Sequence, residues 1–144
     1  QNQIILFIFN QFLWRKIMAT YIIYALILAL VQIWIVPAAF NMKNFPWLGS
    51  NRDEPMPNEL SIMGGRASRA SINLQESLPA FLALALLSMQ LGVEAEAAVS
   101  GLACWWLAFR VAHLIAYIAG IALVRTLLWV GSIFSLIMMA LALV

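Results

Sequence analysis

Apolar residues dominate four long stretches of the chain, and shorter polar segments separate them. The first stretch predicts a helix over about residues 19–40. That length is enough for one span, since about 20 apolar residues cross the hydrocarbon core of a bilayer. The others predict helices over about residues 60–91, 95–119 and 122–144. The pattern therefore predicts an all-α integral membrane protein, built as a four-helix bundle protomer.

Proline and glycine mark where these helices should bend or end. Pro37 lies near the end of the first predicted helix, where a bend costs least. Pro79 removes one backbone hydrogen bond from the second and predicts a kink just after Glu76. Residues 92–96 predict a short acidic turn, and Gly120 predicts a break before the last helix.

The N-terminal residues 1–17 do not fit this pattern. Their apolar part, residues 4–14, is interrupted by Asn10 and Gln11 and is too short to span. Three interpretations are open: an interfacial helix, an incompletely processed signal sequence, or extra sequence ahead of a start at Met18. We favour the last or the first. Residues 1–17 are therefore treated as an extension without an assigned function, ahead of one transmembrane domain over residues 18–144.

The composition agrees with a membrane protein and excludes several other classes. The chain is 65% apolar and 10% charged, whereas a soluble domain carries about 25% charged residues. Its net charge of +2 is too small and too scattered to indicate nucleic-acid binding. One cysteine excludes an internal disulfide, and one histidine with one cysteine excludes the common His/Cys metal sites within a single chain. We expect neither a metal nor a nucleic-acid partner.

Basic residues gather at one end of the predicted bundle. The loop at residues 41–63 and the adjoining helix margins carry them, whereas the turn after the second helix carries only Glu94 and Glu96. An excess of Lys and Arg marks the cytoplasmic side, although Arg15 and Lys16 argue weakly the other way. We predict a multi-pass protein of the cell (inner) membrane with this first loop in the cytoplasm. The basic residues concerned are Lys43, Arg52, Arg66, Arg69 and Arg125.

The second predicted helix carries a polar stripe into an otherwise apolar segment. Arg66, Arg69, Asn73 and Glu76 follow one another at steps of three, four and three, which places them on one face. Polar and ionisable groups are costly against lipid. The stripe must therefore face protein, water or a ligand.

The third and fourth predicted helices bring further polar residues to the same end of the bundle. Arg110, His113 and Tyr117 form a second stripe at steps of three and four. Arg125 and Thr126 open the last helix. In a four-span bundle these positions lie at one membrane face and should converge with the stripe of the second helix.

The converging residues are unevenly charged. Four arginines accompany one carboxylate, Glu76, and a buried arginine without a partner is costly. A ligand with carboxylates would balance them, because the planar guanidinium matches carboxylate geometry. Each residue alone allows a simpler interpretation: arginines at the headgroups, or His113 and Tyr117 as satisfied core residues. The aligned set favours a binding site.

These motifs resemble those of the MAPEG family, membrane-associated proteins in eicosanoid and glutathione metabolism. The first is RAxRAxxNxxExxP, over residues 66–79, and the second is RxxHxxxY, over residues 110–117. An arginine then opens the last helix. The runs RDEP at residues 52–55 and VRTLLW at residues 124–129 look most like the bacterial branch of the family.

The resemblance implies a homotrimer that binds glutathione between neighbouring protomers near the cytoplasmic face. By position, Arg125 would hold the glutathione sulfur as a thiolate, with Thr126 in place of a serine found in some members. Tyr117 belongs with them as a catalytic residue. The residues expected to bind the rest of glutathione are Arg66, Arg69, Asn73, Glu76, Arg110 and His113.

Three functions are therefore weighed. A cation beside a thiol favours the thiolate, which would attack a lipophilic electrophile or a peroxide delivered from the lipid without a metal. We predict such a glutathione-dependent membrane transferase or peroxidase. The alternative is a non-catalytic lipid-binding protein of the same fold. The third possibility is an unrelated bundle, such as a transporter subunit, which would require intramembrane acids or broken helices along a path through the membrane.

The predicted partners are a second and third copy of the chain, glutathione, a lipophilic small molecule or lipid, and membrane lipid.

The first loop carries the acidic residues Asp53 and Glu54. Long loops in compact folds often have a function. We predict that this loop closes over the site and that one of the two carboxylates contacts basic residues there. A solvated turn is the alternative.

Overall fold

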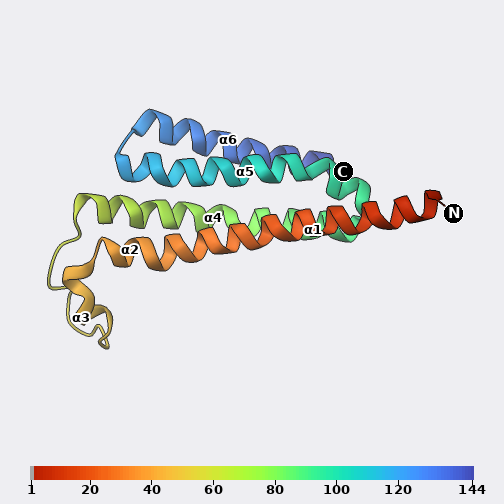
Figure 1. Cartoon of the computed structure of the whole chain (residues 1–144). Coiled ribbons are helices and arrows are strands. Elements are labelled where there is room, and N and C mark those ends of the chain that lie inside the picture. The colour runs from red at the N-terminus through yellow and green to blue at the C-terminus, as the bar shows by residue number, and fades with distance from the viewer. Residues whose placement is uncertain (1) are drawn as a thin grey trace.

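The bundle is formed by four long helical segments that run alongside one another and alternate in direction (Figure 1). The computed structural model describes residues 2–144, apart from the side chains of Asn2 and Gln11; Gln1 of the predicted extension lies outside them. In order, the helices are α1 (Asn2–Leu30), η1 (Val31–Ile35), α2 (Val36–Ala39), η2 (Met42–Asn44), α3 (Phe45–Leu48), α4 (Ile62–Leu91), α5 (Val93–Ala119) and α6 (Ala122–Ala142).

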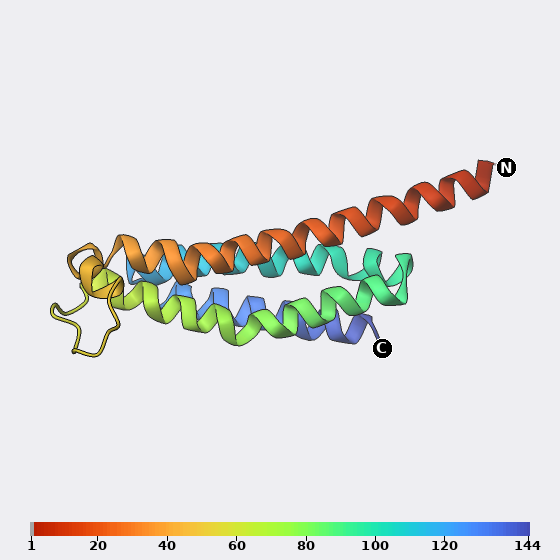
Figure 2. The same ribbon diagram turned by 90° about the horizontal axis from the view of Figure 1, so that it is seen from below.

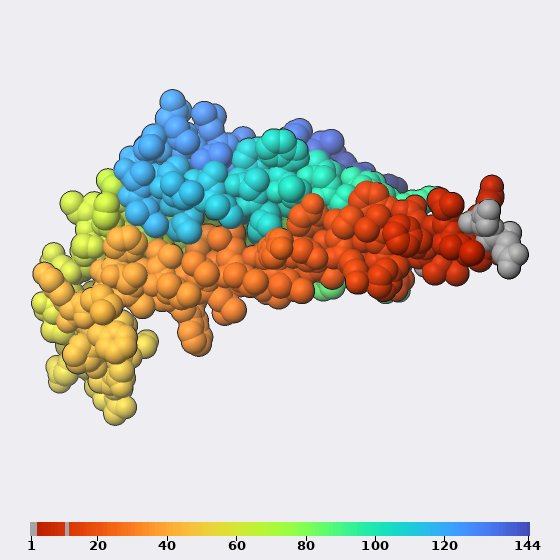
Figure 3. Space-filling view, in the orientation of Figure 1, coloured from red at the N-terminus to blue at the C-terminus, as the bar shows by residue number. Residues whose placement is uncertain are grey.

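Four helical segments of the described chain are long and apolar enough to cross a membrane, which confirms the predicted number of spans. Helix α5 packs against α4 and α6, and α1 packs against α4 and α5. Figure 3 shows the elongated shape of the molecule. Large apolar side chains are exposed along its length, for example Ile27, Leu127 and Phe134. Such a surface suits lipid rather than water as the surrounding solvent.

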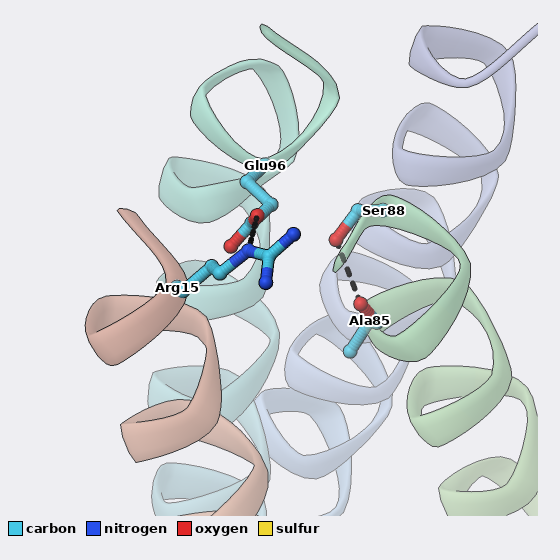
Figure 4. A network of polar contacts seen from close by, with 4 residues as sticks. All are labelled: Arg15, Ala85, Ser88 and Glu96. Atoms are coloured by element: carbon cyan, nitrogen blue, oxygen red, sulfur yellow. Dashed lines mark hydrogen bonds and ion pairs between the residues drawn. The ribbon is translucent and has the colours of Figure 1, made fainter. Parts of the chain in front are cut away.

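The first helix begins earlier than the predicted residue 19. Helix α1 runs without a break from Asn2, and its N-terminal part extends beyond the other helices (Figure 2). No proline or glycine interrupts residues 2–30, so nothing ends the helix between the short apolar segment and the span that follows. Near this end, Arg15 Nε lies 3.9 Å from Glu96 Oε1 of α5, the only ion pair among the described residues (Figure 4).

The first span widens just before Pro37. Residues Val31–Ile35 form a π-helical turn, in which the N–H of Val36 donates to the carbonyl of Val31. Proline has no N–H and its ring clashes with the carbonyl four residues earlier, so a regular α-helix cannot continue through this position. The expected bend near the end of the first span is therefore realised as a π turn.

Small residues allow the helices to approach closely. Ala25, Ala67, Ala85 and Ala103 are fully buried, and small side chains at helix interfaces favour close packing in membranes. Phe81 of α4 stacks on Trp106 of α5, with ring centroids 4.0 Å apart. Both rings are fully buried in the hydrophobic core.

The helix ends follow local chemistry. Ser61 caps α4, because its Oγ accepts a hydrogen bond from the N–H of Gly64 at 3.0 Å. Gly92 alone joins α4 to α5, so residues 93–96 are helical and not the predicted turn. Glu94 and Glu96 lie in the first turn of α5, where carboxylates suit the helix dipole. At the other end of α5, Gly120 adopts a left-handed φ of 80° and ends the helix.

A group of asparagines fixes the first loop. The side-chain nitrogen of Asn44 donates to Asn41 Oδ1 at 2.6 Å and to the carbonyl of Asn58 at 2.8 Å. In return, Asn44 Oδ1 accepts from the backbone N–H and the side-chain nitrogen of Asn58, both at 3.0 Å. Asn44 is almost fully buried. Its amide therefore ties the far side of the loop to the segment that carries α3.

Asn44→Ala should loosen this loop without disturbing the spans. The substitution leaves the backbone groups of Asn58 unpaired, at a cost of about 1–3 kcal/mol for each group that stays buried. Hydrogen exchange of residues 49–61 should become faster, while exchange in α5 stays unchanged. Asn51→Ala is the matched control, because Asn51 is exposed in the same loop. Equal exchange in both variants would show that the asparagine group does not hold the loop.

Candidate functional site

A polar cavity of about 190 Å³ lies where α4, α5 and α6 meet, near the turn that joins the last two helices. Its size alone would not accommodate a drug-sized ligand, which usually needs 300–1,000 Å³. One protomer therefore supplies only part of a larger site if such a ligand binds here. The lining residues are Asn73, His113, Tyr117, Arg125, Thr126 and Trp129.

The cation of the cavity, Arg125, lies beside its aromatic residues. His113 and Tyr117 pack edge to face, with ring centroids 5.4 Å apart. The Arg125 guanidinium carbon lies 4.5 Å from the centroid of the Tyr117 ring, within the range of a cation–π contact. Because Tyr117 lies on α5 and Arg125 on α6, this contact fixes the cation where the two helices meet.

Thr126 lies beside Arg125 and lines the same cavity. Its Oγ1 donates to the carbonyl of Ala122 at 3.0 Å. The hydroxyl proton is thus already used within α6. The free lone pairs of Oγ1 can accept a hydrogen bond from a ligand, and a donating role would require the hydroxyl to rotate.

Arg110 stands behind Asn73 in the bundle interior. It is 1% exposed, and its Nη1 donates to Asn73 Oδ1 at 2.7 Å. Its Nε and Nη2 have no hydrogen-bond partner among the described residues. Unpaired buried donors of a charged group are unfavourable. In this region, Arg110 is therefore the residue whose unpaired donors would gain most from a hydrogen-bond acceptor.

The other residues of the predicted stripe lie outside the cavity. Arg66 donates from Nη1 to the carbonyl of Ile118 at 3.2 Å and packs on Gly120, where an added Cβ would collide with the guanidinium. It therefore caps the C-terminal end of α5. Arg69 and Glu76 are exposed on α4. One protomer thus brings Asn73 together with the residues of α5 and α6, but not Arg66, Arg69 or Glu76.

The acidic residues of the first loop do not reach the cavity in one protomer. Asp53 and Glu54 are exposed, and neither forms an ion pair with any part of the chain that the structure describes. The backbone carbonyl of Glu54 accepts from Trp47 Nε1 at 2.7 Å. The expected contact with basic residues is not formed here, because the loop folds on itself and not over the bundle.

Trp129 also lines the cavity, one helical turn after Arg125, although it is not among the site residues expected from the sequence. The spacing of four residues places the two side chains on one face of α6. Among residues 2–144, no group of three or more His, Cys, Asp or Glu side chains could hold a metal ion.

These features define a four-helix integral membrane protein with a polar, cation-lined cavity between its last three helices. The chain belongs to the MAPEG family, whose family model matches residues 17–144. This family includes glutathione transferases and peroxidases as well as non-catalytic members, and its members commonly use glutathione. A comparison with curated proteins found no match, and neither did a comparison with solved structures.

Proposed function

We propose that this protein is a glutathione-dependent membrane transferase or peroxidase that acts on lipophilic electrophiles. The observation that carries the proposal is the position of Arg125, a cation in a polar cavity beside Tyr117 and Thr126. When glutathione is bound, it supplies a thiolate nucleophile. The chain supplies the cation that favours this thiolate over the thiol.

The other residues of the cavity suit the polar backbone of a peptide-like ligand. Asn73 offers an amide held by Arg110, and His113 borders the same space. Arg110 does not line the cavity but lies behind Asn73, so its two unpaired nitrogens would reach a ligand carboxylate or carbonyl through water or after Asn73 moves aside.

The site is completed, in this proposal, by a neighbouring protomer. Arg69 and Glu76 are exposed on a helix that enters the membrane, where charged side chains normally face protein. A homotrimer would cover this face and bring Arg69 and Glu76 to the cavity of the next protomer. Arg66, which donates to the carbonyl of Ile118 in its own chain, would lie at the edge of the shared site. Such a shared site would also explain why the cavity of one protomer is small.

The remaining assignments rest on sequence patterns. The excess of Lys and Arg around the first loop supports a cytoplasmic location for that end of the bundle. The RDEP and VRTLLW runs support the bacterial branch of the family and thus the inner membrane. We treat residues 18–144 as the functional domain and residues 1–17 as an extension to it.

A non-catalytic, lipid-binding protein of the same fold is the second candidate. The hydroxyl of Thr126 favours it, because its proton is donated to Ala122 and not to the cavity. Glutathione-dependent turnover separates the two candidates.

Mixed trimers should show whether the site is shared. Arg69→Leu and Arg125→Leu should each strongly reduce turnover of a lipophilic electrophile, because each removes one side of every site. Co-expression of the two variants should restore part of the turnover, since a site formed from the intact Arg69 of one chain and the intact Arg125 of its neighbour remains complete. Purified mixed trimers reconstituted in liposomes would be assayed.

Two results would contradict this proposal in different ways. No recovery in verified mixed trimers would place both residues in one protomer or outside the site. Wild-type protein without glutathione-dependent turnover of any electrophile or lipid hydroperoxide would favour the lipid-binding candidate.

A further inference from the structure

A second, larger cavity of about 540 Å³ lies on the side of the first span that carries α3. It shares no residue with the polar cavity. In Figure 3 a notch separates the end of the first span from the projecting lobe that carries α3. Its volume falls in the range of ligand-binding pockets. The lining residues are Ile33, Trp34, Pro37, Ala38, Asn41, Phe45, Leu48 and Arg52.

The cavity arises from two local departures from regular helix. The π turn at Val31–Ile35 contains Ile33 and Trp34, which line the cavity. The short helix α3 then returns against this side and does not continue the span, because Asn44 ties its segment to Asn58. The walls are therefore held apart by the backbone.

The only charged side chain in the lining is Arg52, and the structure fixes its guanidinium. Its Nε and Nη2 donate to the carbonyl of Leu48 at 3.3 and 3.0 Å, and its guanidinium carbon lies 5.8 Å from the centroid of the Trp47 ring. Its backbone N–H donates to Ser50 Oγ at 3.2 Å. Arginine has five N–H donors, so those not bonded to Leu48 can bind an anion.

The backbone of Arg52 is unusual as well. Its φ of 60° is the only positive value for a non-glycine residue in the part of the chain described. A non-glycine residue rarely adopts this conformation, and it persists where the surroundings impose it, often at functional positions. The strain here directs the side chain back toward the end of α3.

The cavity also lies at the depth in the membrane where acyl chains meet lipid headgroups. The first candidate span ends at Ala39, and α3 follows with Trp47, an interfacial type of residue. The polar segment that begins at Gly49 comes next. Apolar walls thus adjoin the hydrocarbon, while Arg52 lies at the level where lipid headgroups are expected.

We propose that this cavity binds an anionic phospholipid, with one acyl chain in the apolar part and the headgroup phosphate on Arg52. Apolar walls accept an acyl chain of any lipid, so Arg52 determines which headgroup the cavity prefers. The planar guanidinium matches the oxygens of a phosphate. A zwitterionic lipid would fill the same walls but carry a positive group near Arg52, which makes it the weaker ligand.

Native mass spectrometry of the full chain in mild detergent tests this assignment. Phosphatidylglycerol and phosphatidylcholine with identical chains would be offered as probes, and wild-type protein should retain the first in preference. Arg52→Gln should lower this preference about tenfold, which corresponds to the loss of a hydrogen bond to a charged group. Arg52→Lys should retain part of it. Lys43→Gln is the matched control, since it removes the same charge from the same loop but not from this cavity.

Ala38→Phe tests the walls, because a phenyl ring at this position fills the cavity and should lower retention of both lipids. Equal effects of Arg52→Gln and Lys43→Gln on the preference would overturn the headgroup assignment. Unchanged lipid retention by folded Ala38→Phe would overturn the proposal, and a changed oligomeric state in the same variant would show that a second copy of the chain fills the cavity. Arg52 is exposed, so Arg52→Gln carries the test alone if Ala38→Phe does not fold.

Discussion

Arg125→Leu should abolish the thiolate absorbance of glutathione while leaving glutathione binding measurable. A free thiol has a pKa near 8.5 and is mostly protonated at neutral pH, whereas an adjacent cation lowers this pKa. Arg125 is the cation of the polar cavity, held against Tyr117. Turnover should fall about 100-fold or more, the usual effect of removing one group that stabilises a reacting anion.

The comparison with Arg125→Lys separates charge from shape. Lysine keeps the cation but not the planar guanidinium that packs on the Tyr117 ring, so it should retain part of the thiolate signal. Binding would be followed by calorimetry, and the thiolate by ultraviolet difference absorbance. A full thiolate signal in Arg125→Leu would assign the sulfur to another group. Loss of all glutathione binding in that variant would assign Arg125 to affinity and not to ionisation.

Arg110→Met should weaken glutathione binding without destabilising the protein. Binding should weaken by about 1.5–3 kcal/mol, roughly 10- to 150-fold, for the lost hydrogen bond to a charged group. In the unliganded protein, however, two nitrogens of this buried side chain are unpaired. Methionine of similar length removes that cost. It also removes the hydrogen bond to Asn73 Oδ1, but Asn73 lines the polar cavity, where water can replace this bond. The midpoint of thermal unfolding in detergent should therefore stay constant or rise.

Arg15→Met is the control, because it makes the same substitution at the opposite end of the bundle, where Arg15 pairs with Glu96. It should leave glutathione affinity unchanged. A parallel fall of affinity and thermal stability in Arg110→Met would show that Arg110 supports the fold and not the ligand. The expected opposition of stability and affinity is typical of residues kept for function.

The sequence was sufficient to predict the spans, because lipid requires nearly every outward side chain to be apolar. It was less informative at the N-terminus. By its own length the apolar segment around Phe7 is too short to span, whereas the structure continues it into the first span, since no breaker separates them. Acidic residues such as those after Gly92 are compatible with a turn, but carboxylates also suit the first turn of a helix.

Part of the lining of the polar cavity was also predictable, because polar side chains within a span must face protein and not lipid. The periods of three and four residues put Asn73, His113 and Tyr117 on facing stripes, and all three line it. Arg66 could not be placed in this way, because its partner is the carbonyl of Ile118, which is left free where α5 ends at Gly120. Backbone acceptors of this kind leave no pattern in the side chains.

The apolar cavity by α3 was not predicted at all. Its walls depend on the π turn before Pro37 and on the hydrogen bonds of Asn44. Proline in a helix predicts a disturbance but not its form. The arrangement of Asn41 and Asn58 around the amide of Asn44 has no local sequence signature.

The most direct test of the central claim is a titration of wild-type protein with glutathione, followed by thiolate difference absorbance in mild detergent at neutral pH. A saturable thiolate signal, lost in Arg125→Leu, is the expected result, since the cavity offers a cation to a bound thiol. Wild-type protein that binds no glutathione at millimolar concentration would contradict the assignment.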